Sequence, residues 1–526
     1  MTHREILEVL SGLLMALFVA MVASTSVSNA LPRIVNHLHG TQGGYTWVVV
    51  AAMLAMTATT PIWGKLADLF SKKLLIQLAL GLFVAGSAIC GLTNSMGLLI
   101  GGRVVSGLGM GGIVALMQTI IAVMVTPRER GRYSGYIGAT FALATVLGPL
   151  IGGVIVDSPL GWRGVFYISV PFALIAFGLL QKTLHIPTVK REVHIDYLGA
   201  FLLVAGVSVL LIWVTLGGNQ IDWSSATSYA MVAGGVIVLA AAIFVEGKVA
   251  KEPIIPLRLF RDRTMVFSSI ASFFVGMGMF GATVYLQQYF QTARDMTPTH
   301  AGLMTVCMVV GLAATSMTTG RLITATGRWK RYLIFGAAVL TVGLFLLSRI
   351  DETTNLALVG LYMAIIGIGV GATNQNLVLA VQNNLSNADM GAGSSVVAFI
   401  RSMGGSIGIA ALGAVLSHQV ADVIKTGIPT LIGQGVKPEE LKSLQGSGIP
   451  DVNTLSSPVA RLVEHAFGVA TGDLFLVGVP CAVIALIAIL LIKETPLRTS
   501  IKEVTAEDID PELAAELEAG GAGGHR

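Results

Sequence analysis

The stretch GKLADLFSKK, residues 64–73, is a short charged segment between two long apolar runs, and it has an echo in the second half of the chain. The echo begins 256 residues later with GRL at 320–322 and continues with GRWKR at 327–331. Glycines spaced by two residues at 107–111 recur at 367–371, at nearly the same offset. Similarity at a fixed offset indicates repeated structural units. The sequence therefore predicts a fold built from two similar halves.

The composition excludes most classes of soluble protein. Only 12% of the 526 residues are charged, whereas soluble domains average about 25%. Hydrophobic residues make up 54%, which leaves too few polar groups to cover a soluble enzyme. The three cysteines all lie inside apolar runs, so they are interpreted as small buried side chains and not as a disulfide or metal set. These features indicate an integral membrane protein.

The apolar runs are long enough to cross a bilayer as helices, which takes about 20 residues each. The first run is longer than the apolar part of a secretory signal, typically about 7–15 residues, and so is expected to stay in the protein. An all-α membrane fold with fourteen transmembrane helices is predicted, at residues 8–31, 44–63, 75–92, 98–124, 135–156, 164–181, 197–217, 227–246, 265–288, 301–319, 332–348, 356–379, 396–418 and 471–492.

The positive charges predict which way the helices cross. With the N-terminus inside, most of the 33 Lys and Arg residues fall in cytoplasmic segments. The short outer loops hold only Arg33, Arg163, Arg294 and Arg349. Positive charge near span ends stays on the cytoplasmic side. We therefore expect a multi-pass protein of the plasma (inner) membrane with both termini in the cytoplasm.

The repeat and the spans together predict the domain organisation. An N-terminal six-helix bundle is expected at 1–182, a linker with two inserted helices at 183–264, and a C-terminal six-helix bundle at 265–492. The second bundle includes a long extracytoplasmic segment at 419–470, either an amphipathic cap or a partner contact, and 493–526 is a cytoplasmic tail. Parallel repeats of this kind occur in one large class of secondary transporters.

Four motifs in order give the chain a family resemblance. Residues 64–73 resemble the helix 2–3 motif of the major facilitator superfamily, although Ser71 stands where the motif has a second Gly. LLIGGRVVSG at 98–107 resembles the helix 4 motif, GPLIGG at 148–153 the helix 5 motif of antiporters, and WRGVFYISVP at 162–171 the entry into helix 6. The resemblance is to the fourteen-helix drug:proton antiporter branch, and it implies multidrug efflux by proton antiport and alternating access.

One departure concerns the proton site. Many members of this branch carry a helix 1 acid about nine residues before the outer Leu-Pro, and here that position is Ala23. The acids nearest the membrane from outside are Asp157, at the end of helix 5, and Asp473, expected in the first turn of helix 14. A helix C-terminal end disfavours negative charge, so Asp157 is the better candidate proton carrier. Both could instead be ordinary helix-end acids.

The gating and coupling candidates are polar or conformationally special residues. An acid and two bases in a short turn could lock one half against the other, with an arginine after helix 4 as partner, or could form a solvated loop. Arg103, inside helix 4, could bias a coupling site or merely bond neighbouring carbonyls. The Gly-Pro pair of helix 5 suits a kinked helix at the interface between the halves. The candidates are Gly64, Asp68, Lys72, Lys73, Arg103, Arg128 (with Arg130 and Arg132 nearby), Gly148, Pro149, Gly152 and Gly153.

A substrate cavity is expected where polar and aromatic residues interrupt apolar spans. Few polar groups in a large apolar pocket suit a lipophilic or amphipathic ligand. Each of these residues could also bond a neighbouring helix. The candidates are Thr25, Ser28, Asn29, Gln118, Tyr285, Gln288, Tyr289, Asn374 and Gln375.

The sequence contains no phosphate-binding loop, metal cluster or nucleophile arrangement, so we expect neither an enzyme nor a cofactor. The expected partners are a small lipophilic substrate, protons and the lipid bilayer, without nucleic acid. A monomer suffices because one chain holds both halves. A lipid or glycolipid exporter remains an alternative, and a non-transporting scaffold or receptor is a further one.

Overall fold

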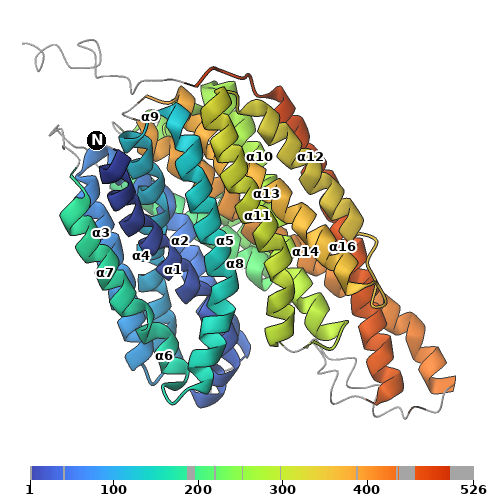
Figure 1. Cartoon of the computed structure of the whole chain (residues 1–526). Helices are drawn as coiled ribbons and strands as arrows, with labels where there is room; N and C mark the ends of the chain where they lie inside the picture. Colours follow the sequence, from blue (N-terminus) through green and yellow to red (C-terminus); the bar gives the residue numbers. More distant parts are fainter. Residues whose placement is uncertain are drawn as a thin grey trace, which may run out of the picture.

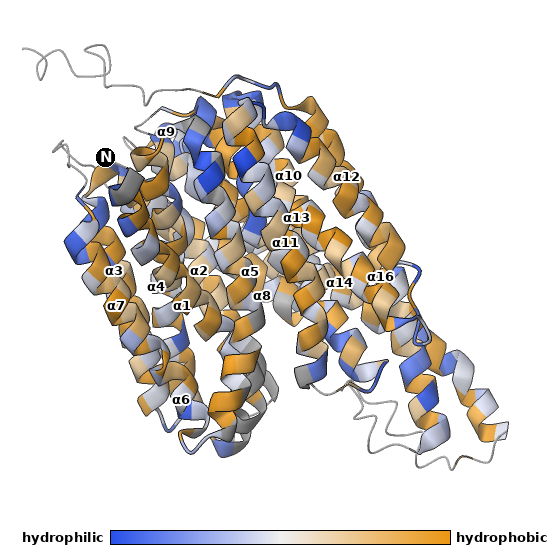
Figure 2. Ribbon diagram, in the orientation of Figure 1, coloured by the Kyte–Doolittle hydropathy of each residue, from blue (hydrophilic) through white to orange (hydrophobic). Residues whose placement is uncertain are grey.

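The computed structural model describes residues 3–38, 42–185, 196–217, 221–250, 253–296, 298–386, 389–433, 436 and 456–497, apart from the side chains of some helix residues in these ranges. These residues form a bundle of long helices (Figure 1). Apolar residues dominate the middle of the helices, and hydrophilic residues gather toward their ends (Figure 2). Many large apolar side chains are exposed on the outside of the bundle, as expected of a surface that meets lipid.

The first six predicted spans are each found in helix. Ser71 and Ser95 begin helices by accepting hydrogen bonds from Leu74 N and Leu98 N. The sixth span is divided between two helices that meet at Ile168. The elements are α1 (His3–His37), α2 (Gln42–Leu69), α3 (Lys72–Leu92), α4 (Met96–Met124), α5 (Pro127–Asp157), α6 (Gly161–Tyr167) and α7 (Ser169–Thr183).

The remaining spans follow in the predicted order. The inserted pair is α8 (Tyr197–Leu216) and α9 (Ala226–Lys248), followed by the 3₁₀ helix η1 (Leu257–Arg261). The second bundle comprises α10 (Arg263–Thr292), α11 (Pro298–Thr326), α12 (Lys330–Leu347), α13 (Leu356–Asn384), α14 (Met390–Gly433) and α16 (Ser457–Leu491). Among the described residues, thirteen helices are long and apolar enough to cross a membrane. With α2, they account for the fourteen predicted spans, which confirms the fold class.

The two bundles repeat the same packing. A Cβ atom at Gly109 of α4 would lie 2.5 Å from Ala79 O on α3, and one at Gly369 of α13 would lie 2.5 Å from Leu340 N on α12. Both glycines therefore allow backbones to approach to a distance that no side chain permits. The repeated glycines thus hold equivalent helix pairs together in the two halves.

The structure corrects the limits of two helices. α14 has 44 residues and α16 has 35, so both continue well into the segment 419–470 that was expected to lie between spans. A 44-residue helix is about 66 Å long, roughly twice the hydrocarbon thickness. Their paired ends protrude from the bundle (Figure 1). Asp473 accordingly lies in the middle of α16 and not in a first turn, so the helix-end interpretation of this residue was wrong.

Candidate transport path and gate

The halves meet mainly along α2 against α14 and along α5 against α11. The hydrogen bonds that the structure describes between the halves lie within a few turns of one end of the bundle. We refer to this end, where residues 70 and 71 link α2 to α3, as the α2–α3 end. Figure 1 places the labelled N-terminus at the same end. The gate candidates are therefore found where the two halves are held together.

Asp68 joins the halves by binding the N-terminus of α14. Its Oδ1 accepts a hydrogen bond from Gly391 N at 2.8 Å, and its Oδ2 accepts one from Ala392 N at 2.9 Å. The first N–H groups of a helix lack partners within the helix and carry partial positive charge, so they favour an anion. Hydrogen bonds to a charged acceptor are about twice as strong as neutral ones. We call this contact between Asp68 and the start of α14 the latch.

Gly64 lies one turn before Asp68 and allows the latch to form. A Cβ atom at Gly64 would lie 2.6 Å from Gly391 O and would also collide with the Ser395 side chain. Backbone atoms cannot move aside as a flexible side chain can. Gly64 therefore allows α14 to approach α2 closely, and Asp68 supplies the hydrogen bonds that hold the two helices together.

The basic residues around the latch have different contacts from those expected. Lys72 is close enough for its charge to act on Asp68. Lys73 instead donates from Nζ to Gln181 O at 2.6 Å, which ties α3 to α7 within one half. Arg130 donates from Nε to Val125 O at 2.8 Å and also bonds Ala122 O, so it turns back onto the end of α4.

A side chain-to-side chain partner for Asp68 was expected among the arginines after α4, but the partners in the structure are backbone groups. Arg132 joins the halves by another route, because its backbone N donates to Thr324 Oγ1 on α11 at 3.2 Å. The Arg128 side chain lies outside the described residues.

Two glutamines meet deeper in the bundle. Gln118 Nε2 on α4 donates to Gln375 Oε1 on α13 at 3.1 Å, and both side chains are buried. α4 and α13 are equivalent helices of the two halves, so this hydrogen bond crosses the interface between them. Asn374 is next to this pair, and its backbone O accepts from Arg401 Nη1 at 3.4 Å. The structure therefore brings together three of the predicted cavity residues.

Other cavity candidates are engaged within one half. Tyr289 OH donates to Asp351 O at 2.7 Å, and Tyr285 OH bonds Ile409 O on α14. Thr25 Oγ1 donates to Met21 O at 3.0 Å within α1. The two tyrosines are buried in the core of the second bundle and bond its backbone carbonyl groups. This is the alternative to a cavity position that the sequence left open for each candidate. Gln288 is half-buried, and the side chains of Ser28 and Asn29 lie outside the described residues.

Gly148 and Gly152 of the helix 5 motif pack against α1, within their own half. Gly148 O accepts from Ser26 Oγ at 2.6 Å, and a Cβ atom at Gly152 would lie 2.9 Å from Ser26 Cα. The expectation that this motif lines the interface between the halves was therefore wrong for these glycines. α5 does meet the other half, but through Gly135, where a Cβ atom would lie 2.9 Å from Met317 Cα on α11. The side chains of Pro149 and Asp157, and the surroundings of Gly153, lie outside the described residues.

Arg103 is buried between α4 and α2. Its Nε donates to Val48 O at 3.1 Å, and only 4% of the residue is exposed. This bond is of the kind expected from the packing alternative, in which the arginine joins neighbouring helices of one half. Asp473 is half-buried on α16, just before the apolar run that ends the helix.

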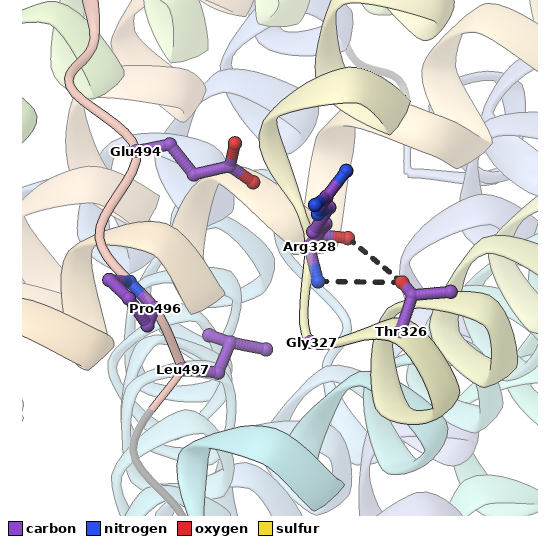
Figure 3. Close-up of a pocket in the computed structure, with 6 residues that line it drawn as sticks. All are labelled: Thr326, Gly327, Arg328, Glu494, Pro496 and Leu497. Atoms are coloured by element: carbon purple, nitrogen blue, oxygen red, sulfur yellow. Dashed lines mark hydrogen bonds between the residues drawn. The ribbon is translucent and has the colours of Figure 1, made fainter.

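A pocket of about 430 Å³ lies at the turn between α11 and α12, beneath the segment that follows α16 (Figure 3). Glu494 Oε1 accepts from Trp329 N at 3.0 Å and from Lys330 N at 3.2 Å, so it caps α12. All residues that line this pocket belong to the second half, so the pocket is not the passage between the halves. No sequence pattern pointed to this cap, because Glu494 follows Lys330, the first residue of α12, by 164 residues.

Comparison with known proteins agrees with this architecture. The chain belongs to the Major Facilitator Superfamily, whose family model matches residues 13–409. It is 33% identical over 517 residues to the efflux pump dotC of Dothistroma septosporum, covering 96% of this chain and 86% of the relative. It is 35% identical over 415 residues to the multidrug transporter protein MdtP of Bacillus subtilis, covering 79% and 76% of the two chains.

A solved structure shares the fold. The human organic anion transporter MFSD10 (TETRAN) aligns with a TM-score of 0.57 over 90% of this chain and 99% of its own, at 13% identity. This likeness bears on the fold alone. The protein is a multi-pass membrane transporter and not an enzyme.

Proposed function

We propose that this protein exports lipophilic or amphipathic small molecules across the plasma membrane by proton antiport and alternating access. The observation that carries the proposal is the latch, because Asp68 joins the two halves at one end through two hydrogen bonds to α14. A contact that can form and break between two rigid halves suits a gate. The names of the relatives, efflux pump and multidrug transporter, support export as the direction.

The distribution of Lys and Arg supports a cytoplasmic position for the α2–α3 end. The described state would then be closed toward the cytoplasm. In the proposed cycle, the latch breaks when substrate enters from the cytoplasm or from the inner leaflet. It forms again as the opposite end opens for release. The buried amides Gln118, Asn374 and Gln375 are proposed to face the polar part of the substrate when the halves separate.

The proposal is tested with purified protein in proteoliposomes. Ethidium serves as the first lipophilic probe, together with a panel of lipophilic cations and neutral dyes, and an imposed pH gradient provides the driving force. We expect the dye to accumulate against its gradient, and we expect a protonophore to abolish this accumulation. Transport that ignores the pH gradient would contradict antiport, and no transport of any dye together with movement of a fluorescent phospholipid would favour the lipid-exporter alternative.

A further inference from the structure

The inserted helix α8 lies over the seam between the two halves, with α9 packed against it. α8 contacts both α2 and α14. One apolar cluster contains Ala58 of α2, Leu203 and Val207 of α8, and Phe399 of α14. Any movement of α2 relative to α14 must therefore change the contacts of the inserted pair.

Glu246, near the end of α9, is buried at this seam. Only 7% of the residue is exposed. Its Oε2 accepts a hydrogen bond from Ile255 N at 3.1 Å, and Ile254 and Ile255 pack into the apolar cluster of the seam. Its Oε1 is buried and has no hydrogen-bond partner among the described residues. A buried carboxylate oxygen without a partner is costly in its charged form.

A second acid lies beside it. Asp196 Oδ1 accepts from Gly199 N at 2.8 Å and caps α8, whereas its Oδ2 is buried and unpartnered within the described part of the chain. The charges that act on Glu246 are the repulsive one of Asp196 and the attractive one of Lys65. α8, which packs against α9, contains no Asp, Glu, Lys, Arg or His, and its Tyr197 is exposed, as is Lys248 at the end of α9.

Lys65 connects this acid pair to the latch. It lies between Gly64 and Asp68 on α2, and its charge acts on Asp68 as well as on Glu246. The buried Oε1 of Glu246, which has no hydrogen-bond partner among the described residues, makes the charged form costly, and a bound proton removes that cost. When Glu246 is ionised, its charge holds Lys65 and strengthens the bond to Ile255. When it is protonated, both attractions weaken and the inserted pair holds the seam less firmly.

We propose that Glu246, paired with Asp196, is the proton-binding site that couples this transporter to the pH gradient, in place of the helix 1 acid that Ala23 does not supply. The step is the reversible addition of one proton to the Glu246 carboxylate, which loses its negative charge. The proton arrives from the outer side while the α2–α3 end is closed and leaves to the cytoplasm while that end is open, so one proton moves inward as substrate moves outward. This inference rests on the proposed antiport, and it replaces Asp157 and Asp473 as carrier.

The first experiment measures proton release from detergent-purified protein in weak buffer when a transported dye is added, beginning with ethidium. Glu246→Gln should bind the dye but release no proton, while the wild type and Asp222→Asn release protons alike. Asp222 is an exposed acid between α8 and α9, so its change is a matched control. Normal release from Glu246→Gln would overturn the assignment while leaving antiport intact. If the wild type binds the dye and releases none, antiport itself fails.

A second set of variants separates proton binding from folding. Glu246→Asp keeps a titratable group and should restore part of the pH-driven uphill transport, with a shifted pH profile. Glu246→Gln should still allow downhill dye movement in proteoliposomes but lose accumulation against the gradient. If Glu246→Asp and Glu246→Gln lose transport to the same extent in both directions, Glu246 is structural and the inference is wrong.

Discussion

Gln118 Nε2 on α4 lies 3.1 Å from Gln375 Oε1 on α13, and α4 and α13 are equivalent helices of the two repeated halves. The hydrogen bond therefore crosses the interface between the two halves. Both amides are buried, so their separation must expose them to water or to substrate. The pair is therefore expected to report directly on whether the halves are closed at this depth.

The glutamine pair predicts non-additive mutations. Gln118→Leu or Gln375→Leu alone leaves one buried amide without its partner, which costs about 1–3 kcal/mol. The double variant removes both amides and should be more stable than the sum of the single effects predicts. Thermal unfolding in detergent measures this, with Gln288→Leu on half-buried Gln288 as control. Strict additivity would show that the two amides do not interact.

The close approach at Gly64 predicts a steric effect on the gate. Gly64→Ala should prevent α14 from docking and slow dye transport, because the new methyl group would meet Gly391 O and Ser395. Gly81→Ala on α3 is the matched control, since a Cβ atom there meets no atom within 4 Å. Equal transport rates for both variants at equal expression would show that the gate does not require the close approach of α14 at Gly64.

The cap on α12 predicts a local change in stability. Glu494→Ala removes the acceptor for Trp329 N and Lys330 N and should cost about 1 kcal/mol in the first turn of α12. Hydrogen exchange of that turn should become roughly fivefold faster, while Lys493→Ala leaves it unchanged. Unchanged exchange in Glu494→Ala would mean that the cap does not stabilise the turn.

The sequence was sufficient to predict the helices and the repeat, because apolar length and close-packing glycines are local signals. It was misleading about the ends of α14 and α16. Those ends contain polar residues, and they pack against each other through residues that are far apart in the sequence, as at Gly427 and Leu462. The fold class could therefore be predicted, but the extent of these two helices could not.

The candidate site was predicted less completely. Asp68 was recognised, but its partners are the backbone N–H groups of Gly391 and Ala392, which no side-chain pattern reveals. Arg130 was a plausible partner by charge, yet it is satisfied by carbonyl groups at the end of α4. Glu246 stood at the end of an expected span, and its importance emerged only from its burial at the seam, where its backbone-bonded neighbour Ile255 packs into the apolar cluster.

The central claim is that Asp68 holds the two halves together, and a spin-label distance measurement tests it most directly. Labels at Leu74→Cys on α3 and Arg328→Cys between α11 and α12 report on the two halves at the α2–α3 end, in a background without Cys90, Cys307 and Cys481. Losing a charged acceptor costs about 1.5–3 kcal/mol, so Asp68→Asn should shift the equilibrium toward the open state by roughly tenfold or more. The account predicts a new population at longer distance in Asp68→Asn. Distance distributions identical to those of the parent protein would contradict it.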